Sequence, residues 1–390
     1  MKICAVVAEY NPLHLGHIKH IEYMKKVLNA EHILVIMSGN FTQRGEPAIL
    51  NKFTRARQAV LAGADAVIEL PTVFATANAE IFAKGAMKIL DSLGVADGLC
   101  FGVESGTAED FSDLAMKFTN ETKEFKKLLK ARLSEGVSLA KARFSAIKEL
   151  YGEDVDEELI LKPNNILGLE YTKALISLKS DVKIYPMLRE GDHNDAVLKK
   201  GITSATSIRL AVKEGKLKKL KKNLPPYTYK DLKEYPNAFD KMILSALYRA
   251  SKEELSEIPD CTEGLENRIK ALITGSDNIE ELIEKISTKR YTAARIRRIF
   301  TANLLGINKD LINDCLTSPL YAKVLAVNSS NKNIISELNK NGNIPVITRK
   351  SDALRLKGTA RVCYEKDALA NDLYNLAADE NFNQNYTVMV

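Results

Sequence analysis

Apolar, strand-like runs alternate with amphipathic helical segments through the first part of the chain. The runs are rich in β-branched and small residues, end at proline or glycine signals, and lie at residues 2–10, 32–39, 66–71 and 98–106. Between them, apolar residues recur at helical spacing from Gly16 onward, over 54–65 and over 81–94. Because each run is nearly all apolar, the pattern predicts a parallel sheet with helices on both faces. We therefore expect a doubly wound, Rossmann-like α/β domain that binds its ligand at the carboxyl ends of the strands.

The rest of the chain has a different composition, with fewer strand-like runs and more charged helical segments. Residues 107–160 are charged and helical, which indicates an excursion from the sheet, and a further strand returns near 182–188. After a pair of prolines, short amphipathic helices rich in lysine and arginine follow. The prediction is a catalytic α/β domain over 1–224 and a mostly helical, basic C-terminal domain over 225–390, with a small βαβ-like segment at 320–350.

Cysteine usage and hydropathy exclude several classes of protein. Five cysteines in 390 residues show no CxxC spacing, which argues against a zinc ribbon and is typical of a reducing cytoplasm. The chain has no apolar run of about eighteen residues, and its start lacks the pattern of a secretory signal. We expect a cytoplasmic protein without a membrane span. The net charge of +6 is mild, so the placement of the cations matters more than their sum.

Two histidines flank a glycine where the first strand gives way to a helix, in the stretch HLGH. Gly16 lets a ligand approach the backbone, and the amides at a helix N-terminus attract phosphate. His14 and His17 can each donate a hydrogen bond to a phosphate oxygen. The alternatives are a metal pair, for which no acid or cysteine stands at ligand spacing, and simple helix capping. His20, one turn later, either reaches the same pocket or faces solvent.

A second pattern, TSATSIR at residues 203–209, precedes another expected helix. The hydroxyls of Ser204, Thr206 and Ser207 can cap that helix or donate to phosphate, and Arg209 adds a fork of donors. Alone, the stretch is an ordinary helix cap. Together with HLGH it predicts a site that handles a nucleotide.

The two patterns together resemble the nucleotidylyltransferase superfamily, whose doubly wound enzymes attack the α-phosphate of a nucleotide with loss of pyrophosphate. SATSIR departs modestly from the commoner ISSTxIR and keeps the hydroxyls and the arginine. Longer blocks narrow the likeness to the bacterial tRNA(Met) cytidine acetate ligase family, which the chain resembles through at least residue 305. The blocks are VVAEYNPLHLGH, VIMSGNFTQRGEPAILNKFTRARQAVLAGADAVIELP, FGVESG, KPNNILGLEY, TSATSIR and TEGLENRI…TKRYTAARIRRI.

The resemblance implies an ATP-dependent ligase that forms acetyl-adenylate from acetate and ATP. It then transfers the acetyl group to the wobble cytidine of elongator tRNA(Met), giving N4-acetylcytidine. The catalytic candidates are His14, His17 and Arg209. Mg²⁺ is the expected companion of the triphosphate, although no acid cluster marks a metal site. The candidate ATP-binding residues, with the three hydroxyls included, are Val7, Ala8, Glu9, Tyr10, Asn11, Pro12, His14, Gly16, His17, His20, Gly102, Asn164, Arg189, Ser204, Thr206 and Ser207.

Clustered cations suggest where tRNA binds, because its phosphate backbone attracts lysine and arginine. One stretch, 213–222, holds six lysines against one glutamate; the other, 287–299, is arginine-rich and offers a tyrosine for base stacking. For each, a solvated surface is the alternative. The candidate tRNA-binding residues are Lys218, Lys219, Lys289, Arg290, Tyr291, Arg295, Arg297 and Arg298.

Three other possibilities stay open at this point. The segment after the second strand, with Gln43, Arg44 and Glu46, either lines the acetate or cytidine side of the site or is only a loop. A small-molecule adenylyltransferase that makes a nucleotide cofactor is disfavoured by the basic C-terminal half. A non-catalytic ATP- and RNA-binding protein is disfavoured because both histidines are present.

Overall fold

The strands of the molecule form one sheet. The computed structural model describes residues 2–119, 122–137, 139–152, 156–189, 203–233, 238–288, 290–378 and 387–390. The strands run in the order β5-β4-β1-β2-β3-β6-β7, and β8 pairs with β6. Their bounds are β1 Ile3–Ala8, β2 His32–Ser38, β3 Ala66–Leu70, β4 Gly98–Val103, β5 Lys183–Leu188, β6 Ala322–Val327, β7 Val346–Ile347 and β8 Val388–Met389. All pairs among β1–β5 are parallel, which confirms the predicted α/β class.

The order of the strands reverses at β1. The chain passes from β1 through β2 to β3 on one side, then returns to place β4 and β5 on the other side of β1. In open α/β sheets, a crevice for ligands forms outside the carboxyl ends of the strands at such a reversal. The fold therefore puts a binding site between the ends of β1 and β4.

Alternate side chains along the strands enter two separate cores. Cys4 and Val6 of β1 pack with Ile21 of α1 (Leu15–Lys26) and Phe53 of α2 (Lys52–Leu61). Ala5, on the opposite face, packs in the core that includes α3 (Thr72–Ala75), α4 (Ala79–Leu93) and α9 (Pro163–Leu178). Both faces are thus buried, which explains why the strands read as continuous apolar runs.

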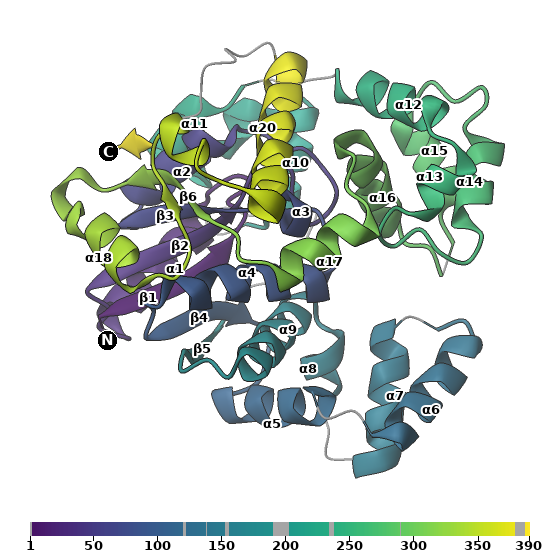
Figure 1. The fold of residues 1–390 in the computed structure, drawn as a ribbon, viewed down its shortest axis with the longest axis horizontal. Helices are drawn as coiled ribbons and strands as arrows, with labels where there is room; N and C mark the ends of the chain where they lie inside the picture. The colour runs from purple at the N-terminus through teal and green to yellow at the C-terminus, as the bar shows by residue number, and fades with distance from the viewer. Residues whose placement is uncertain are drawn as a thin grey trace.

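Between β4 and β5 the chain makes the helical excursion expected at 107–160. It contains α5 (Ala108–Thr119), α6 (Lys123–Ser134), α7 (Leu139–Tyr151) and α8 (Glu157–Leu161) before α9 leads back to β5. In Figure 1, α6 and α7 project from the sheet on the same side as the helices that follow residue 238.

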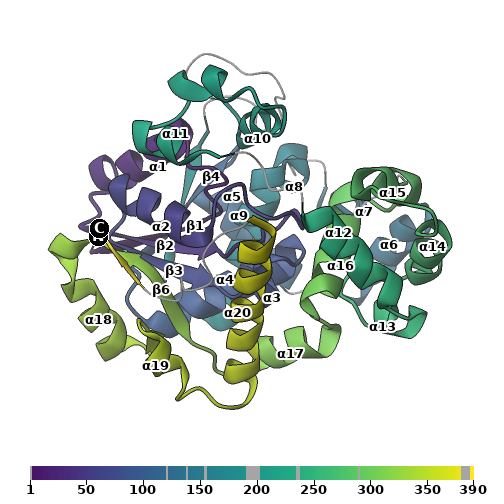
Figure 2. The ribbon, with the colours of Figure 1, turned by 90° about the horizontal axis from the view of Figure 1, so that it is seen from above.

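After β5 the chain is mostly helical until β6. Figure 2 shows α10 and α11 on one side of the sheet and α12–α16 gathered beside it. These elements are α10 Ala205–Lys213, the 3₁₀ helix η1 Leu217–Lys222, α11 Pro226–Asp231, α12 Phe239–Arg249, α13 Lys252–Ser256, α14 Leu265–Leu272, α15 Ile279–Ile286, α16 Ala293–Leu305 and α17 Lys309–Thr317.

The last seventy or so residues contribute β6, β7 and β8 to the same sheet as β1–β5. The prediction instead assigns all residues after 224 to a separate C-terminal domain. β6, α18 (Asn333–Asn341) and β7 form the parallel βαβ unit expected at 320–350, but β6 also pairs antiparallel with β3. The remaining elements there are η2 Ser329–Asn331, α19 Lys350–Ala353 and α20 Gly358–Ala378. The pairing is held by buried charge: Lys323 of β6 and Lys52 of α2 both bind the carboxylate of Glu69 on β3, at 3.1 and 2.6 Å. Periodicity identifies a strand but does not name its neighbour, so the sequence pattern missed this pairing.

None of the helices in the described ranges is long and apolar enough to cross a membrane.

Candidate active site

A cleft of about 350 Å³ opens at the reversal point between β1 and β4. The end of β1, α1, β4, α9, the end of β5 and α10 each contribute to its wall. Of the residues predicted to bind ATP or to act in catalysis, those that line the cleft are Val7, Ala8, Glu9, Tyr10, Asn11, His17, His20, Gly102, Asn164, Arg189 and Arg209. Residues nearly two hundred positions apart in the sequence thus meet, as the two patterns predicted.

His14 and His17 hold each other in one orientation at the start of α1. The N–H of Gly16 donates to Nδ1 of His14 at 3.1 Å, and the N–H of His14 donates to Nδ1 of His17 at 3.2 Å. The two rings stack with centroids 3.8 Å apart, and the ring of Tyr10 meets that of His17 edge-on at 4.9 Å. Since each Nδ1 accepts a hydrogen bond, each neutral ring carries its proton on Nε2. His17 therefore offers an oriented N–H donor at the wall of the cleft.

The helix amides expected to bind phosphate are already occupied, which corrects that part of the prediction. The N–H of Gly16 is taken by the His14 ring, and the N–H groups of His17 and Ile18 both donate to the carbonyl of His14, at 2.9 and 3.3 Å. A histidine at the N-cap closes the first turn with its own side chain. His14 is buried beneath His17 and, with Pro12 and Gly16, supports the wall instead of forming it.

The hydroxyls of TSATSIR have two different roles: some cap α10, and one accepts a hydrogen bond from Arg209. Ser204 is the N-cap of α10 and accepts from the N–H of Ser207 at 3.1 Å, and the Ser207 hydroxyl donates to the carbonyl of Ser204 at 2.9 Å. Both residues are buried, so the capping alternative describes them. Thr206 instead accepts a hydrogen bond from Nη2 of Arg209 at 3.1 Å, while Nη1 of Arg209 donates to the carbonyl of Asn11 at 3.0 Å. Arg209 is thereby fixed against the segment that follows β1.

Arg189 lies across Gly102 on the β4 side of the cleft. A Cβ at Gly102 would stand 3.1 Å from Cγ and Cδ of Arg189, so the arginine stem uses the space that glycine leaves. Its Nη1 donates to Oδ1 of Asn164 at 3.2 Å, and Nδ2 of Asn164 donates to Glu104 at 2.6 Å. Burial lowers the pKa of Arg189, and the negative charge of Glu104 partly offsets this. The guanidinium is thus a partly desolvated cation at a ligand site.

His20 faces the cleft from α1, which resolves its position. Its Nε2 lies 3.1 Å from Sγ of Cys100. Burial, and then the positive charge of Arg189, lower the pKa of His20 to about 4. The imidazole is therefore neutral at physiological pH and contributes no charge to the site.

Comparison with known proteins agrees with this geometry. The model of the HIGH Nucleotidyl Transferase family matches residues 1–388. A protein of Caldanaerobacter subterraneus named tRNA(Met) cytidine acetate ligase is 38% identical over 387 residues, which cover 97% of this chain and 96% of that protein. The protein of that name from Clostridium novyi is 40% identical over 358 residues, 89% of each chain. The crystal structure of apo Thermotoga maritima TmcAL matches at a TM-score of 0.92 with 28% identity, covering both chains fully.

The chain belongs to the tRNA(Met) cytidine acetate ligase family. The resemblance predicted from the sequence blocks is thus confirmed. The Thermotoga maritima TmcAL structure bound with alpha-thio ATP also matches over both full chains, at a TM-score of 0.88 and 27% identity.

In this member of the ligase family, the apolar part of the cleft was missed from sequence. Phe82 of α4, Phe101 of β4, and Ile166, Leu167 and Tyr171 of α9 all line it. Each lies at an apolar position of a helix or strand, where packing in the core is the ordinary expectation. For all but Tyr171, which lies in the middle of α9, the one available signal was closeness to predicted strand ends and helix starts.

Two of the three residues singled out in the loop after β2 line the cleft. Gln43 and Arg44 line it, and the N–H of Gln43 donates to the carboxylate of Glu9 at 2.7 Å. Glu46 instead faces Arg297 at 3.3 Å.

The structure shows what the predicted tRNA-binding side chains contact. Lys218 and Lys219 are exposed on η1. The stretch after residue 288 is extensively paired: Arg290 binds Glu263, Arg297 binds Glu280 and Glu46, and Arg298 binds Asp260 at 3.0 Å. Arg295 donates to the Asp260 carbonyl at 2.9 Å and to Thr262 at 2.8 Å, and lies over the ring of Tyr291. Lys289 lies outside the described residues.

Proposed function

We propose that this chain is an ATP-dependent acetate ligase for the wobble cytidine of elongator tRNA(Met), releasing AMP and pyrophosphate. The observation that carries the proposal is one cleft, at the reversal point of the sheet, in which His17, Arg189 and Arg209 converge. A triphosphate needs cations and N–H donors fixed in advance, and these side chains supply both. Thermotoga maritima TmcAL, which has the same fold, has been crystallised with alpha-thio ATP.

In the first step a carboxylate oxygen of acetate attacks the α-phosphorus of ATP, and the bond to the β-phosphate breaks. Acetyl-adenylate forms and pyrophosphate leaves. The Nε2–H of His17 donates to phosphate oxygens as charge builds on them, and Arg209 holds the leaving pyrophosphate. His14 orients His17 from below, at a ring separation of 3.8 Å. The chemistry requires no covalent help from the protein, so positioning and charge do most of the work.

The adenosine lies on the β4 side of the cleft in this proposal. Gly102 leaves the space in which the stem of Arg189 lies, and the aromatic rings of Phe101 and Tyr171 offer an apolar surface. Asn164, held by Glu104 at 2.6 Å, presents a fixed amide to the nucleotide. Arg189 lies between this surface and the phosphates.

In the second step the exocyclic amine of cytidine attacks the acyl carbon, a proton is lost, and AMP departs. Mg²⁺ would accompany the triphosphate, with phosphate oxygens and water as its main ligands. This fits because Glu9 is the one carboxylate among the described residues lining the cleft, and no group of three His, Cys, Asp or Glu side chains gathers elsewhere in the described ranges. The enzyme acts in the cytoplasm, where its five unpaired, buried cysteines stay reduced.

The test combines purified protein, ATP, labelled acetate and bulk tRNA. Label in tRNA, together with AMP and pyrophosphate, is the expected result. ATP consumption that requires a nucleotide or phosphopantetheine acceptor would indicate a cofactor-making adenylyltransferase instead. Binding of tRNA without pyrophosphate release would indicate a non-catalytic protein.

His17→Ala tests the assignment of the phosphate site. We expect loss of acetate-dependent ATP–pyrophosphate exchange by a factor of about 10²–10³, with tRNA affinity unchanged. His32→Ala is the matched control, because His32 begins β2 at the opposite end of the sheet from the cleft. A large loss of tRNA affinity in His17→Ala would contradict this division of roles.

A further inference from the structure

A second cavity, of about 330 Å³, lies between the helical excursion and the sheet domain. Side chains from α4, α5, α6, α7 and α9 line it. Four of them are cationic, Lys84, Lys126, Arg143 and Lys173, and two are carboxylates, Glu80 and Glu170. The lining therefore carries an excess of positive charge, and the predicted acetate-ligase chemistry assigns it no role.

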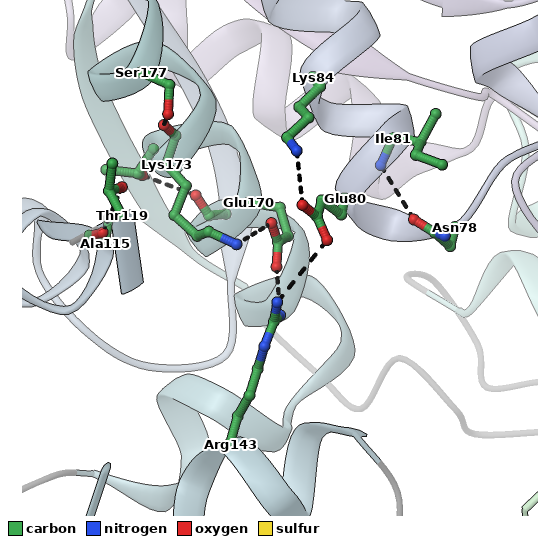
Figure 3. Close-up of polar contacts among 12 residues, drawn as sticks. Asn78, Glu80, Ile81, Lys84, Ala115, Thr119, Arg143, Glu170, Lys173 and Ser177 are labelled. Atoms are coloured by element: carbon green, nitrogen blue, oxygen red, sulfur yellow. Dashed lines mark hydrogen bonds and ion pairs between the residues drawn. The ribbon is translucent and has the colours of Figure 1, made fainter. Parts of the chain in front are cut away.

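Arg143 organises this cavity. Figure 3 shows it extending from α7 toward Glu170, with which Nη1 makes a 2.8 Å ion pair, and toward Glu80, whose carboxylate lies 3.9 Å from Nη2. Lys173 binds the other oxygen of Glu170 at 2.7 Å. Nε of Arg143 is buried and has no hydrogen-bond partner among the described residues. The ring of Phe118 supports the guanidinium from 5.5 Å.

The cavity continues into a row of lysines on α6. The row consists of Lys123, Lys126, Lys127 and Lys130, which are all exposed and, by their spacing, share one face of the helix. Phe125 on the opposite face is buried in the core. No acid within the described ranges makes an ion pair with any of the four lysines, and Lys126 belongs to both the row and the cavity. The row is about 10 Å long, enough for about three successive phosphates of one nucleic-acid strand.

The cavity shares its wall with the nucleotide cleft. On α9, Glu170 lines the cavity while the next residue, Tyr171, lines the cleft; on α4, Ala79 lines the cleft while Glu80 lines the cavity. Neighbouring Cα atoms are about 3.8 Å apart, so a ligand in the cavity lies one helix away from the reacting nucleotide.

We propose that the Arg143 cavity and the lysine row of α6 bind backbone phosphates of the RNA substrate. A small anion would contact only the cavity. A polyanion can contact the cavity and the lysine row of α6 at the same time. A guanidinium grips phosphate with paired donors, and exposed lysines add point charges along the strand. The proposal rests on the proposed tRNA substrate and places its backbone on the excursion, beyond the basic stretches expected from sequence.

The test is tRNA binding by the full chain over a series of salt concentrations. Lys126→Ala/Lys130→Ala should weaken binding and reduce the slope of log K against log salt by about 0.7–0.9 for each lost contact. Lys332→Ala/Lys340→Ala is the matched control, since both lysines are exposed near or on α18, which lies far from α6 in Figure 1. Its slope should equal that of the wild type.

A variant that is expected to tighten tRNA binding controls for a general loss of structure in the lysine double variant. Glu80→Gln removes a negative charge from the cavity without removing a cation, so it should tighten tRNA binding. Acetate-dependent ATP–pyrophosphate exchange, which requires no RNA, should stay at wild-type level in the lysine double variant. Absence of exchange and of tRNA acetylation in the wild type would refute the proposed function itself. Acetylation with an unchanged salt slope in the lysine double variant, whether or not inorganic phosphate binds the cavity, would refute only this surface.

Discussion

Removing the buried carboxylate of Glu69 is expected to destabilise the protein strongly. Glu69 binds Nζ of Lys52 at 2.6 Å and Nζ of Lys323 at 3.1 Å, and the three side chains are 1%, 1% and 5% exposed. Burial alone would raise the pKa of Glu69, but the two ammonium groups outweigh it and hold the pKa below its ordinary value. The carboxylate is therefore ionised and compensates two buried cations.

Glu69→Gln leaves both ammonium groups facing a neutral amide. Breaking a buried ion pair by removing one partner costs about 3–5 kcal/mol of unfolding free energy, because the remaining charge is uncompensated. Urea unfolding followed by circular dichroism at neutral pH measures this loss. Glu135→Gln is the control, since its ion pair with Arg132 is exposed and screened by solvent, so this variant should leave stability nearly unchanged.

A triple variant separates lost charge balance from lost packing. Lys52→Met/Glu69→Leu/Lys323→Met replaces these three side chains by apolar ones of similar size and keeps the neighbouring buried Asp367, and it should recover most of the stability that Glu69→Gln loses. A cost below about 1 kcal/mol for Glu69→Gln, or a triple variant no more stable than the single one, would refute this electrostatic account.

Three further predictions concern single positions. The pKa of His20 is about 4 when folded and about 6.5 when unfolded, so the unfolded chain binds more protons as pH falls from 6.5 to 4. Stability should fall by at most about 3 kcal/mol over that window, and His20→Gln should remove that part of the pH dependence in urea unfolding. Gly102→Ala pushes against Arg189 and should weaken ATP binding about fivefold, near 1 kcal/mol by calorimetry, with the thermal midpoint unchanged. Gly45→Ala combines a φ of +73° with a collision against the backbone of α16, and should cost about 2–3 kcal/mol; Gly215→Ala, at φ +69° with open space around it, should cost only about 1. Equal costs for the two glycine variants would contradict the role of the collision.

Much of the fold could be predicted because its decisive signal is local. A strand buried on both faces must be apolar along its length, and Ile3–Ala8 and His32–Ser38 show this directly. The pairing of Ala322–Val327 with β3 could not be predicted, because a nearly continuous apolar run looks the same beside a parallel or an antiparallel neighbour. Its partner is specified by Lys323, whose buried position is visible only in three dimensions.

The candidate site, like the fold, could be predicted from the sequence only in part. His17 and Gly102 could be predicted from position, since the carboxyl ends of parallel strands converge whatever the details of packing. The roles within HLGH could not, because which nitrogen of His14 or His17 accepts a backbone proton depends on the conformation of the turn. Tyr171 also gave no local signal that it faces a ligand.

The sequence is least informative about which cations are available to bind RNA, and this has a physical cause. Arginine is selected for ion pairs as readily as for RNA, and Arg298 shows this by binding Asp260, a residue thirty-eight positions earlier. The lysines of α6 have no such partner in the described ranges, although their segment reads only as a charged helix. A cation contributes to long-range attraction of a polyanion only when no neighbouring carboxylate cancels its field. The proposed RNA-binding surface is therefore sought among the cations that remain uncompensated after folding, and by that criterion α6 ranks above the arginine-rich stretch.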